Sequence, residues 1–362
     1  MITKSRLYIY NNFYNYLKIF VNLFIGKNNK NFENLLKEKI NKHIILTAQA
    51  RVGMYYIAKY LVKKEYKKFY ISPYTNIEVI EALKFAKCEI NFIDLDLKMG
   101  IPNNINEIMN KKNEKKCLII THLFNNIENL NKLNEILKDR DESLIVVEDT
   151  AINFGSKYKN KHLGTLFDFG FFSFGKLKNL SIIYGGAIYY KEKSFEKYYL
   201  SEEEKMRNFS KIYFLRELLS SIFINFFNSK IINVIVSSVI YKRMYYPPYQ
   251  FSKFFYNSLN PTINKTIPIN YFFRFPYFLS DIAVSKYEKV LIEINERYEK
   301  ASYYNLQLKN IEEIDLFEFS DLDGHTNSYM EYPIILKFEN KFKLLKYLTT
   351  KNIFLRLHWY KN

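Results

Sequence analysis

The sequence has few of the residues that cross-link small folds or that end helices and strands. It has 2 cysteines, 8 prolines, 10 glycines and 1 tryptophan among 362 residues. Cys88 and Cys117 form no CxxC pair, which argues against a disulfide framework or a cysteine zinc site and predicts a reducing compartment. The basic start of the chain is followed by an apolar stretch interrupted by asparagines, with no small-residue cleavage site, so no signal peptide is predicted.

The chain also lacks a clean membrane-spanning run. The most apolar stretch, residues 213–241, is interrupted by charges and by recurring serine and asparagine. A span needs about 20 consecutive apolar residues, so this stretch predicts a packed helical insertion or a helix lying on a membrane surface. Residues 7–25, aromatic and apolar with polar interruptions, predict an amphipathic helix.

Acidic residues are outnumbered by basic ones, 37 to 54, which gives a net charge of +17. A charge of this size is typical of proteins that bind nucleic acid or an anionic membrane. However, lysine is abundant here together with asparagine, isoleucine, tyrosine and phenylalanine, a set typical of coding bias in an AT-rich genome, and the lysines are scattered between acids. Because no groove-reading motif is present, we expect no nucleic-acid partner.

From residue 44 onward, short apolar runs alternate with stretches of helical spacing. This alternation predicts an α/β fold with a mostly parallel sheet covered by helices on both faces. Residues 280–308 predict a long helix, and residues 331–358 a small α/β unit. We expect four regions: an N-terminal extension (1–31), a large domain (32–200), an apolar helical insertion with a connector (201–275) and a small C-terminal domain (276–362).

Six of the ten glycines lie between Gly155 and Gly186, inside a segment rich in candidate functional residues. That segment, residues 146–191, reads VVEDTAINFGSKYKNKHLGTLFDFGFFSFGKLKNLSIIYGGAIYYK. Concentrated glycines indicate tight turns or close ligand approach. In open α/β sheets, ligands bind beyond the carboxyl ends of strands, and Asp149 lies at such an end. An acid there, followed by a serine and a lysine, suits the binding of an aldehyde cofactor.

The order E-D-T-A, then G-S-K-Y-x-x-K-x-x-G-T, then S-F-x-x-x-K-N, then G-G-A-I resembles the pyridoxal-phosphate sugar aminotransferases of the DegT/StrS type. The resemblance covers residues 32–191 well and residues 280–358 loosely. It implies a fold-type I architecture, with a large domain that binds pyridoxal 5'-phosphate and a small C-terminal domain. It also implies a nucleotide-sugar substrate, glutamate as amino donor, a homodimer and a cytoplasmic location, to which the apolar stretches add peripheral membrane contact.

By this resemblance, Lys178 is the catalytic lysine that condenses with the cofactor aldehyde, since Lys176 has the wrong spacing from Ser173. Asp149 would pair with the pyridine nitrogen, and Ser173 would bind the cofactor phosphate. The family's glycine-threonine pair at the start of the first helix corresponds to Ala50 and Arg51. A helix N-terminus supplies amide donors to a phosphate, and the Arg51 guanidinium can add a bidentate contact.

Three positions depart from the family pattern. Asn76, which we include among the cofactor-binding residues, stands where the family often has an aromatic ring, and Ile152 and Tyr184 replace polar residues. The sequence thus predicts an aminotransferase for a nucleotide-linked keto-sugar in surface-polysaccharide or amino-sugar biosynthesis. The alternative is a catalytically impaired member that acts as a binding or regulatory subunit. Dehydratases of the family replace the lysine, so the presence of Lys178 favours transamination.

Four further residues are weaker candidates. Asn270 and Arg274 align loosely with residues that reach a neighbouring subunit's cofactor in the family. Arg356 and His358 could meet a carboxylate or a sugar phosphate from the small domain, although ordinary strand-end roles are equally compatible with their positions.

Overall fold

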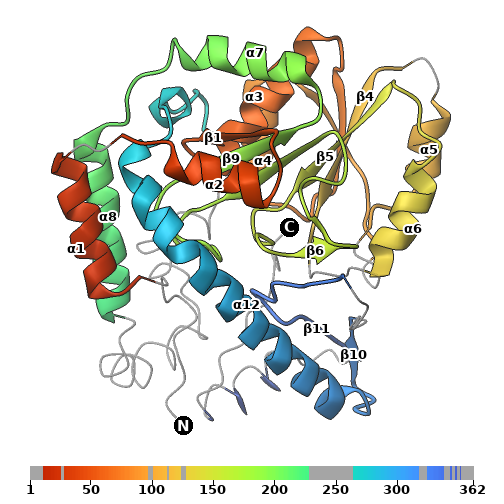
Figure 1. Ribbon diagram of the computed structural model, residues 1–362. Coiled ribbons are helices and arrows are strands. Elements are labelled where there is room, and N and C mark those ends of the chain that lie inside the picture. Colours follow the sequence, from red (N-terminus) through yellow and green to blue (C-terminus); the bar gives the residue numbers. More distant parts are fainter. Residues whose placement is uncertain are drawn as a thin grey trace.

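The computed structural model describes residues 11–25, 28–96, 101–111, 114–123, 128–227, 264–317, 324–337, 343–344, 347–348 and 351. Its central feature is a seven-stranded sheet in the order β1-β9-β8-β5-β4-β2-β3 (Figure 1). Its strands are β1 (Ile44–Thr47), β2 (Lys68–Ile71), β3 (Glu89–Phe92), β4 (Lys116–Thr121), β5 (Leu144–Asp149), β8 (Phe169–Ser173) and β9 (Gly186–Tyr190).

Only β9 runs against its neighbours. It pairs antiparallel with both β1 and β8, whereas β8, β5, β4, β2 and β3 pair in parallel. The predicted α/β fold with a mostly parallel sheet is therefore confirmed. Because the parallel strands point the same way, their carboxyl ends gather at one edge, which is where ligands bind in such sheets.

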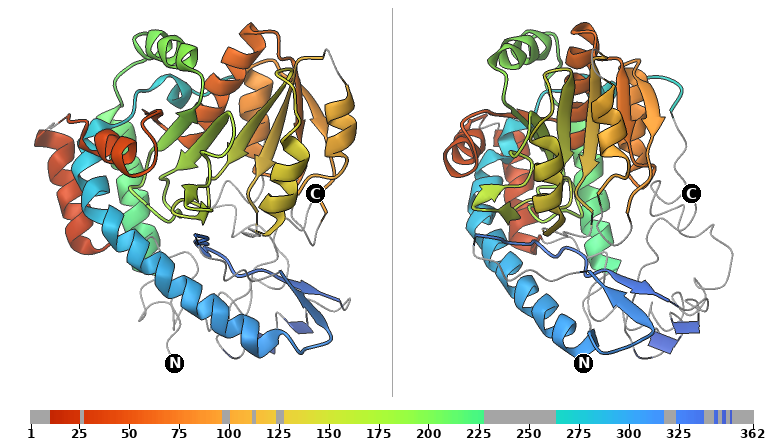
Figure 2. Two further views of the ribbon diagram at one scale, coloured as in Figure 1. Left: turned by 45° about the vertical axis from the view of Figure 1, so that its right-hand side comes forward. Right: turned by 90° about the vertical axis from the view of Figure 1, so that its right-hand side faces the viewer.

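The side chains of β4 explain why helices cover both faces of the sheet. Cys117 and Ile119 belong to one buried cluster, and the alternate residues Leu118 and Ile120 belong to another. This period of two places successive side chains on opposite faces. The first cluster includes α3 (Ala50–Lys63) and α4 (Ile77–Phe85), and the second includes α5 (Ile105–Asn110) and α6 (Glu128–Leu137). Figure 2 shows the sheet with helices on both sides.

Further elements surround this core. The predicted long helix is confirmed as α12 (Ser280–Leu308), which runs from the helices near the N-terminus to the small β10–β11 pair (Figure 1). The others are α1 (Phe13–Ile25), α2 (Asn31–Lys39), β6 (Lys157–Tyr158), β7 (Lys161–His162), α7 (Lys193–Glu203), α8 (Lys211–Phe227), η3 (Ile269–Phe272), η4 (Tyr277–Leu279), β10 (Ile314–Leu316) and β11 (Ile334–Leu336).

Within the described residues, no helix is long and apolar enough to cross a membrane. The apolar stretch predicted at residues 213–241 is helical as far as Phe227, where α8 ends, and residues 228–241 lie outside the described residues. The strand expected near residues 353–358 also lies outside them, with Arg356 and His358. The division into four regions stays a prediction.

Candidate active site

The carboxyl ends of the strands bring two of the predicted residues to one edge of the sheet. Asp149 ends β5 and pairs with Phe171 of β8, two residues before Ser173 ends that strand. Ser173 in turn pairs with Gly186 of β9, and Gly186 pairs with Thr47 of β1. The edge thus carries an acid and a hydroxyl on parallel strands, next to the turn that leads into α3.

The start of α3 lies against this edge because residue 186 has no side chain. A Cβ on Gly186 would lie 2.5 Å from the Ala50 amide nitrogen and 2.6 Å from the Gln49 carbonyl carbon. The N–H groups of Ala50 and Arg51 make no hydrogen bond with other described residues. Unpaired N–H groups at a helix N-terminus are ready donors for an anion. Ser173 adds a hydroxyl that is likewise without a hydrogen bond among the described residues.

Replacement of Gly186 by alanine should therefore damage both fold and site. Since the Cβ would meet backbone, the start of α3 must shift, and we expect unfolding to become easier by about 1–3 kcal/mol. Urea denaturation measures this change. Gly175→Ala is the matched control, because a Cβ there meets only the Ser173 hydroxyl at 3.6 Å and Lys178 Cγ at 4.0 Å. Equal losses in both variants would contradict the steric argument.

Lys178 lies in the loop after β8, within reach of the same edge. Its Cγ and the Ser173 hydroxyl oxygen both fall within 4.0 Å of the point where a Gly175 Cβ would stand. Lys178 is half-buried. The competing Lys176 is engaged elsewhere: its Nζ lies 2.7 Å from a Glu217 carboxylate oxygen and 3.1 Å from the Ser220 hydroxyl, both on α8. The geometry thus separates the two lysines, and Lys178 is the one beside Ser173.

Asp149 and Lys178 also interact electrostatically. Burial raises the pKa of the Asp149 carboxyl above its ordinary value, since it removes the charged form from water. Three groups work against this rise: the Ala151 N–H, which donates to Asp149 Oδ1 at 3.0 Å, the Lys178 ammonium and His122. A desolvated carboxylate of this kind is stabilised by a cationic partner.

Asn179, beside Lys178, fixes the loop that carries the lysine. Its amide nitrogen donates to the backbone oxygens of Ile152 at 3.3 Å and Phe154 at 3.0 Å. Its amide oxygen accepts from Arg297 Nη2 of α12 at 3.2 Å. The loops after β5 and β8 are thereby joined, which holds the lysine segment near Asp149. Sequence reasoning recognised Asn179 only as part of a motif and missed this function.

Glu148 was also missed, although the acidic pair was recognised. Its carboxylate is fully buried and accepts hydrogen bonds from the backbone N–H groups of Gly164, Leu166 and Phe167 at 2.7–3.1 Å. His122 Nε2 lies 2.9 Å from its Oε1. Glu148 therefore holds the glycine-rich segment against the sheet, while its neighbour Asp149 faces the site.

Two of the six predicted residues have side chains engaged in other contacts. Arg51 Nη1 pairs with Glu78 Oε1 at 2.8 Å. Burial has the largest single effect and disfavours the charged guanidinium, but Glu78 together with Tyr184, Tyr271 and Tyr213 outweighs it, so the pKa of Arg51 is raised. The Asn76 side chain caps α4, since its Oδ1 accepts from the Glu78 N–H at 3.0 Å. Because its guanidinium pairs with Glu78, the group of Arg51 that is available to a phosphate is its backbone N–H.

A group of buried polar atoms without hydrogen bonds to described residues accompanies the start of α3. It comprises the hydroxyls of Tyr184 and Tyr271 and the side-chain oxygen of Asn270. Asn270 reaches this region within its own chain, because its Nδ2 donates to Gln49 Oε1 at 3.3 Å. Arg274, by contrast, donates to the backbone oxygens of Glu203 and Glu204. Tyr184 and Asn270 also lie close enough to influence each other, so these side chains form a buried polar cluster at the start of α3.

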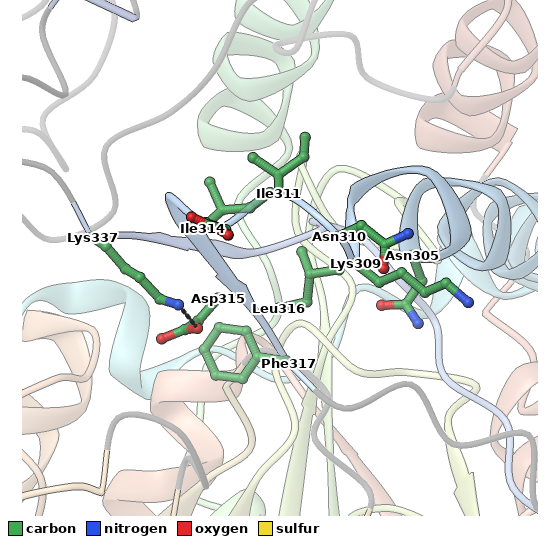
Figure 3. Close-up of a pocket in the computed structure, with 10 residues that line it drawn as sticks. Asn305, Lys309, Asn310, Ile311, Ile314, Asp315, Leu316, Phe317 and Lys337 are labelled. Atoms are coloured by element: carbon green, nitrogen blue, oxygen red, sulfur yellow. Dashed lines mark ion pairs between the residues drawn. The ribbon is translucent and has the colours of Figure 1, made fainter.

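A hollow of about 620 Å³ opens elsewhere, between the end of α12 and the β10–β11 pair (Figure 3). Lys309, Asp315 and Lys337 line it, and Lys337 pairs with Asp315 at 2.7 Å. None of the six residues predicted to bind the cofactor lines this hollow. It is therefore separate from the candidate site.

The segments that form this edge of the sheet are similar to those of known proteins. The profile of the DegT/DnrJ/EryC1/StrS aminotransferase family matches residues 18–212, more than half of the chain. The chain belongs to this family. The match includes the edge of the sheet described above, from the start of α3 to the Gly185–Gly186 pair.

Individual relatives agree with this assignment. The chain is 28% identical over 167 residues to GDP-perosamine synthase of Escherichia coli O157:H7, a match covering 45% of this chain and 44% of that protein. It thus spans less than half the length of this curated relative. Among solved structures, E. coli GDP-4-keto-6-deoxy-D-mannose-3-dehydratase with bound hydrated PLP gives a TM-score of 0.70 at 14% identity, covering 100% and 87% of the two chains. Helicobacter pylori PseC, an aminotransferase, gives 0.67 at 17%, covering 98% and 84%.

The DegT family implies pyridoxal 5'-phosphate, and the residues present fit it. Its phosphate needs several hydrogen-bond donors, which the Ser173 hydroxyl and the N–H groups of Ala50 and Arg51 can supply. Its pyridine nitrogen needs an acid, and Asp149 is a buried carboxylate with one hydrogen bond to a described residue. Its aldehyde needs an amine, and Lys178 lies near both groups.

Proposed function

We propose that this DegT-family protein is a pyridoxal-phosphate aminotransferase that transfers an amino group to a keto carbon of a nucleotide-linked sugar. The observation that carries the proposal is the juxtaposition of Lys178 with Asp149 and Ser173 at the carboxyl edge of the sheet. Amine, acid and phosphate donors at one edge are the groups that such chemistry requires.

When bound, the cofactor supplies an electron sink for the carbanion that forms as a proton leaves the amino-bearing carbon. We assign one task to each protein group. The Asp149 carboxylate would keep a proton on the pyridine nitrogen. The Ser173 hydroxyl and the N–H groups of Ala50 and Arg51 would bind the phosphate. The Lys178 amine would hold the cofactor and, once released, would carry the proton between the amino-bearing carbon of the substrate and the cofactor carbon that had held the aldehyde. Asn179 positions the loop that carries this lysine.

The substrate class, donor and assembly are parts of the same proposal. A relative named GDP-perosamine synthase supports a nucleotide-linked sugar as the acceptor. Because one of the similar structures is a dehydratase, structural similarity does not decide between dehydration and amino transfer. The retained Lys178 favours amino transfer. Glutamate as donor, a homodimer, a cytoplasmic location and a place in surface-polysaccharide or amino-sugar biosynthesis follow from the family resemblance.

The first experiment is uptake of the cofactor and its reaction with glutamate. Purified protein should bind pyridoxal phosphate with a visible absorption band, and glutamate alone should bleach that band while one equivalent of 2-oxoglutarate is released. Failure to bind pyridoxal phosphate would show that the proposal is wrong.

One outcome of that experiment would support the second candidate, a catalytically impaired binding or regulatory subunit. In that case the band forms but glutamate leaves it unchanged. The observation that favours this candidate is Asn76, whose side chain caps α4 at the position where the family often has a ring that stacks on the cofactor. Substitution Asn76→Tyr, followed by the same glutamate assay, tests whether the missing ring is the cause.

A further inference from the structure

Helix α1 is apolar on its outer side as well as its inner side. Tyr16, Ile19 and Leu23 form a buried stripe at helical spacing. Seven large apolar side chains of the same helix are exposed, with Phe13 at 83% and Ile25 at 64%; they are Phe13, Tyr14, Leu17, Phe20, Val21, Phe24 and Ile25. Asn15, Lys18 and Asn22 form a polar stripe on the same helix, so the exposed apolar residues form a separate side, of the kind that marks an interaction site.

Helix α8 lies beside α1 and extends this surface, as Figure 1 shows. The Tyr16 hydroxyl donates to the Ser221 backbone oxygen at 3.3 Å, and Asn225 Nδ2 donates to that hydroxyl at 2.8 Å. Five large apolar side chains of α8 are exposed as well, and the surface takes in three of them, Ile212, Leu219 and Ile222, with the seven of α1. We call these ten side chains the α1/α8 face. Exposed apolar side chains gathered on two adjacent helices mark an interaction site.

The α1/α8 face is fixed to the body of the protein. The buried Lys286 of α12 donates to Asn11 Oδ1 at 2.6 Å, immediately before α1. Asn22 Nδ2 donates to the Phe278 backbone oxygen at 3.4 Å. Because α1 is held at both of these points, its outer side keeps one orientation, and the face is a defined surface.

Two segments, one that contains α1 and one that begins within α8, contain no acidic residue. Segments 1–32 and 218–280 together carry eleven basic residues and no Asp or Glu, although acids make up 37 of the 362 residues of the chain. At that frequency about ten acids would be expected in 95 residues, and Glu33, Glu217 and Asp281 bound the two segments. On the two helices themselves, Glu217 is the one acid, and it pairs with Lys176 at 2.7 Å.

We propose that the α1/α8 face docks on the surface of an anionic phospholipid bilayer. Its apolar side chains would enter the boundary between head groups and acyl chains, and nearby Lys18, Lys211 and Arg216 would meet the anionic head groups. Neither helix is long and apolar enough to cross the bilayer, so both lie along its surface.

Charge decides between a bilayer and a second copy of the chain. A two-fold dimer would place the same face of each copy together. Lys18, Lys211 and Arg216 of one copy would then lie near the same three residues of the other, which is unfavourable. An anionic lipid surface supplies both apolar contact and the opposite charge.

Vesicle cosedimentation of the full chain tests the proposal. Wild type should sediment with phosphatidylcholine vesicles that contain phosphatidylglycerol, less so in high salt, and stay in solution with phosphatidylcholine alone. The variant Phe13→Ser/Phe20→Ser/Phe24→Ser should lose at least about a hundredfold in partitioning. The variant Lys18→Gln/Lys211→Gln/Arg216→Gln should lose at least about tenfold.

A matched variant of α12 is the control. Ile292→Ser/Tyr303→Ser/Leu306→Ser also removes three exposed apolar side chains, but outside the face, and should sediment like wild type. Circular dichroism and urea midpoints check that every variant is folded. The proposal is overturned if wild type ignores anionic vesicles, binds both compositions equally or loses binding equally in the control. A wild-type dimer that the Phe variant splits, without vesicle binding, would instead assign the face to a second copy.

Discussion

Replacing Lys178 with alanine should abolish the visible band of the cofactor-loaded protein and lower amino transfer by at least about a thousandfold. The amine is both the attachment point of the cofactor and the group that moves the proton, and such a group contributes about 10²–10⁴ for the proton transfer alone. Lys178 is the lysine placed beside Ser173 and Asp149. Absorption spectra and stopped-flow measurement of the glutamate reaction provide the two readouts.

Lys176→Ala is the matched control for this experiment. It removes a lysine only two positions away, whose amine contacts Glu217 and Ser220 of α8. We expect this variant to keep the visible band and a rate within about threefold of wild type, because a partly exposed ion pair contributes little. If Lys176→Ala lost the band and Lys178→Ala kept it, the assignment of the two lysines would be reversed.

The largest expected effect on stability belongs to Glu148. Substitution Glu148→Gln should lower the free energy of unfolding by about 3 kcal/mol, since an amide cannot accept on its nitrogen the bonds that the carboxylate accepts. Three backbone N–H groups and His122 depend on this one side chain, which is fully buried. Urea denaturation measures the loss.

Asp149→Asn provides the comparison, one residue further along the chain. Its Oδ1 can still accept from the Ala151 N–H, and burial already disfavours the charge of Asp149, so stability should change by less than about 1 kcal/mol. Amino transfer, however, should fall by about a hundredfold or more, because the pyridine nitrogen would lose its acid. A large loss of stability in Asp149→Asn and none in Glu148→Gln would contradict the division of tasks between the two acids.

Much of the fold follows from local patterns. Residues 280–308 have helical spacing throughout, and the helix begins and ends where that spacing does. Residues 44–47 form an apolar run between polar neighbours, and β1 matches it. Short or polar elements were missed: β6 and β7 have two residues each, and α7 begins with few apolar residues. The reversed direction of β9 depends on pairing between distant segments, which no local pattern encodes.

In the candidate site, too, local motifs predict some features and contacts between distant segments determine the others. Motif order predicts Lys178, Asp149 and Ser173 as site residues, and the fold brings these three together. Side-chain partners could not be predicted, because they depend on packing between segments far apart in the sequence. Asn76 precedes α4 and caps it, and Asn179 receives a hydrogen bond from a helix more than a hundred residues later.

That distant hydrogen bond has a consequence for synthesis on the ribosome. The strands of the sheet, residues 44–190, leave the exit tunnel well before Arg297 and Ser328. Arg297 joins these late segments to Asn179, since its Nη2 donates to the Asn179 amide oxygen and its Nε donates to the Ser328 backbone oxygen. When the sheet segments emerge, the loop that carries Lys178 therefore still lacks the hydrogen bond from Arg297 to Asn179. We therefore expect the segment that carries Lys178 to reach its final position only after residues 297–328 have been synthesised.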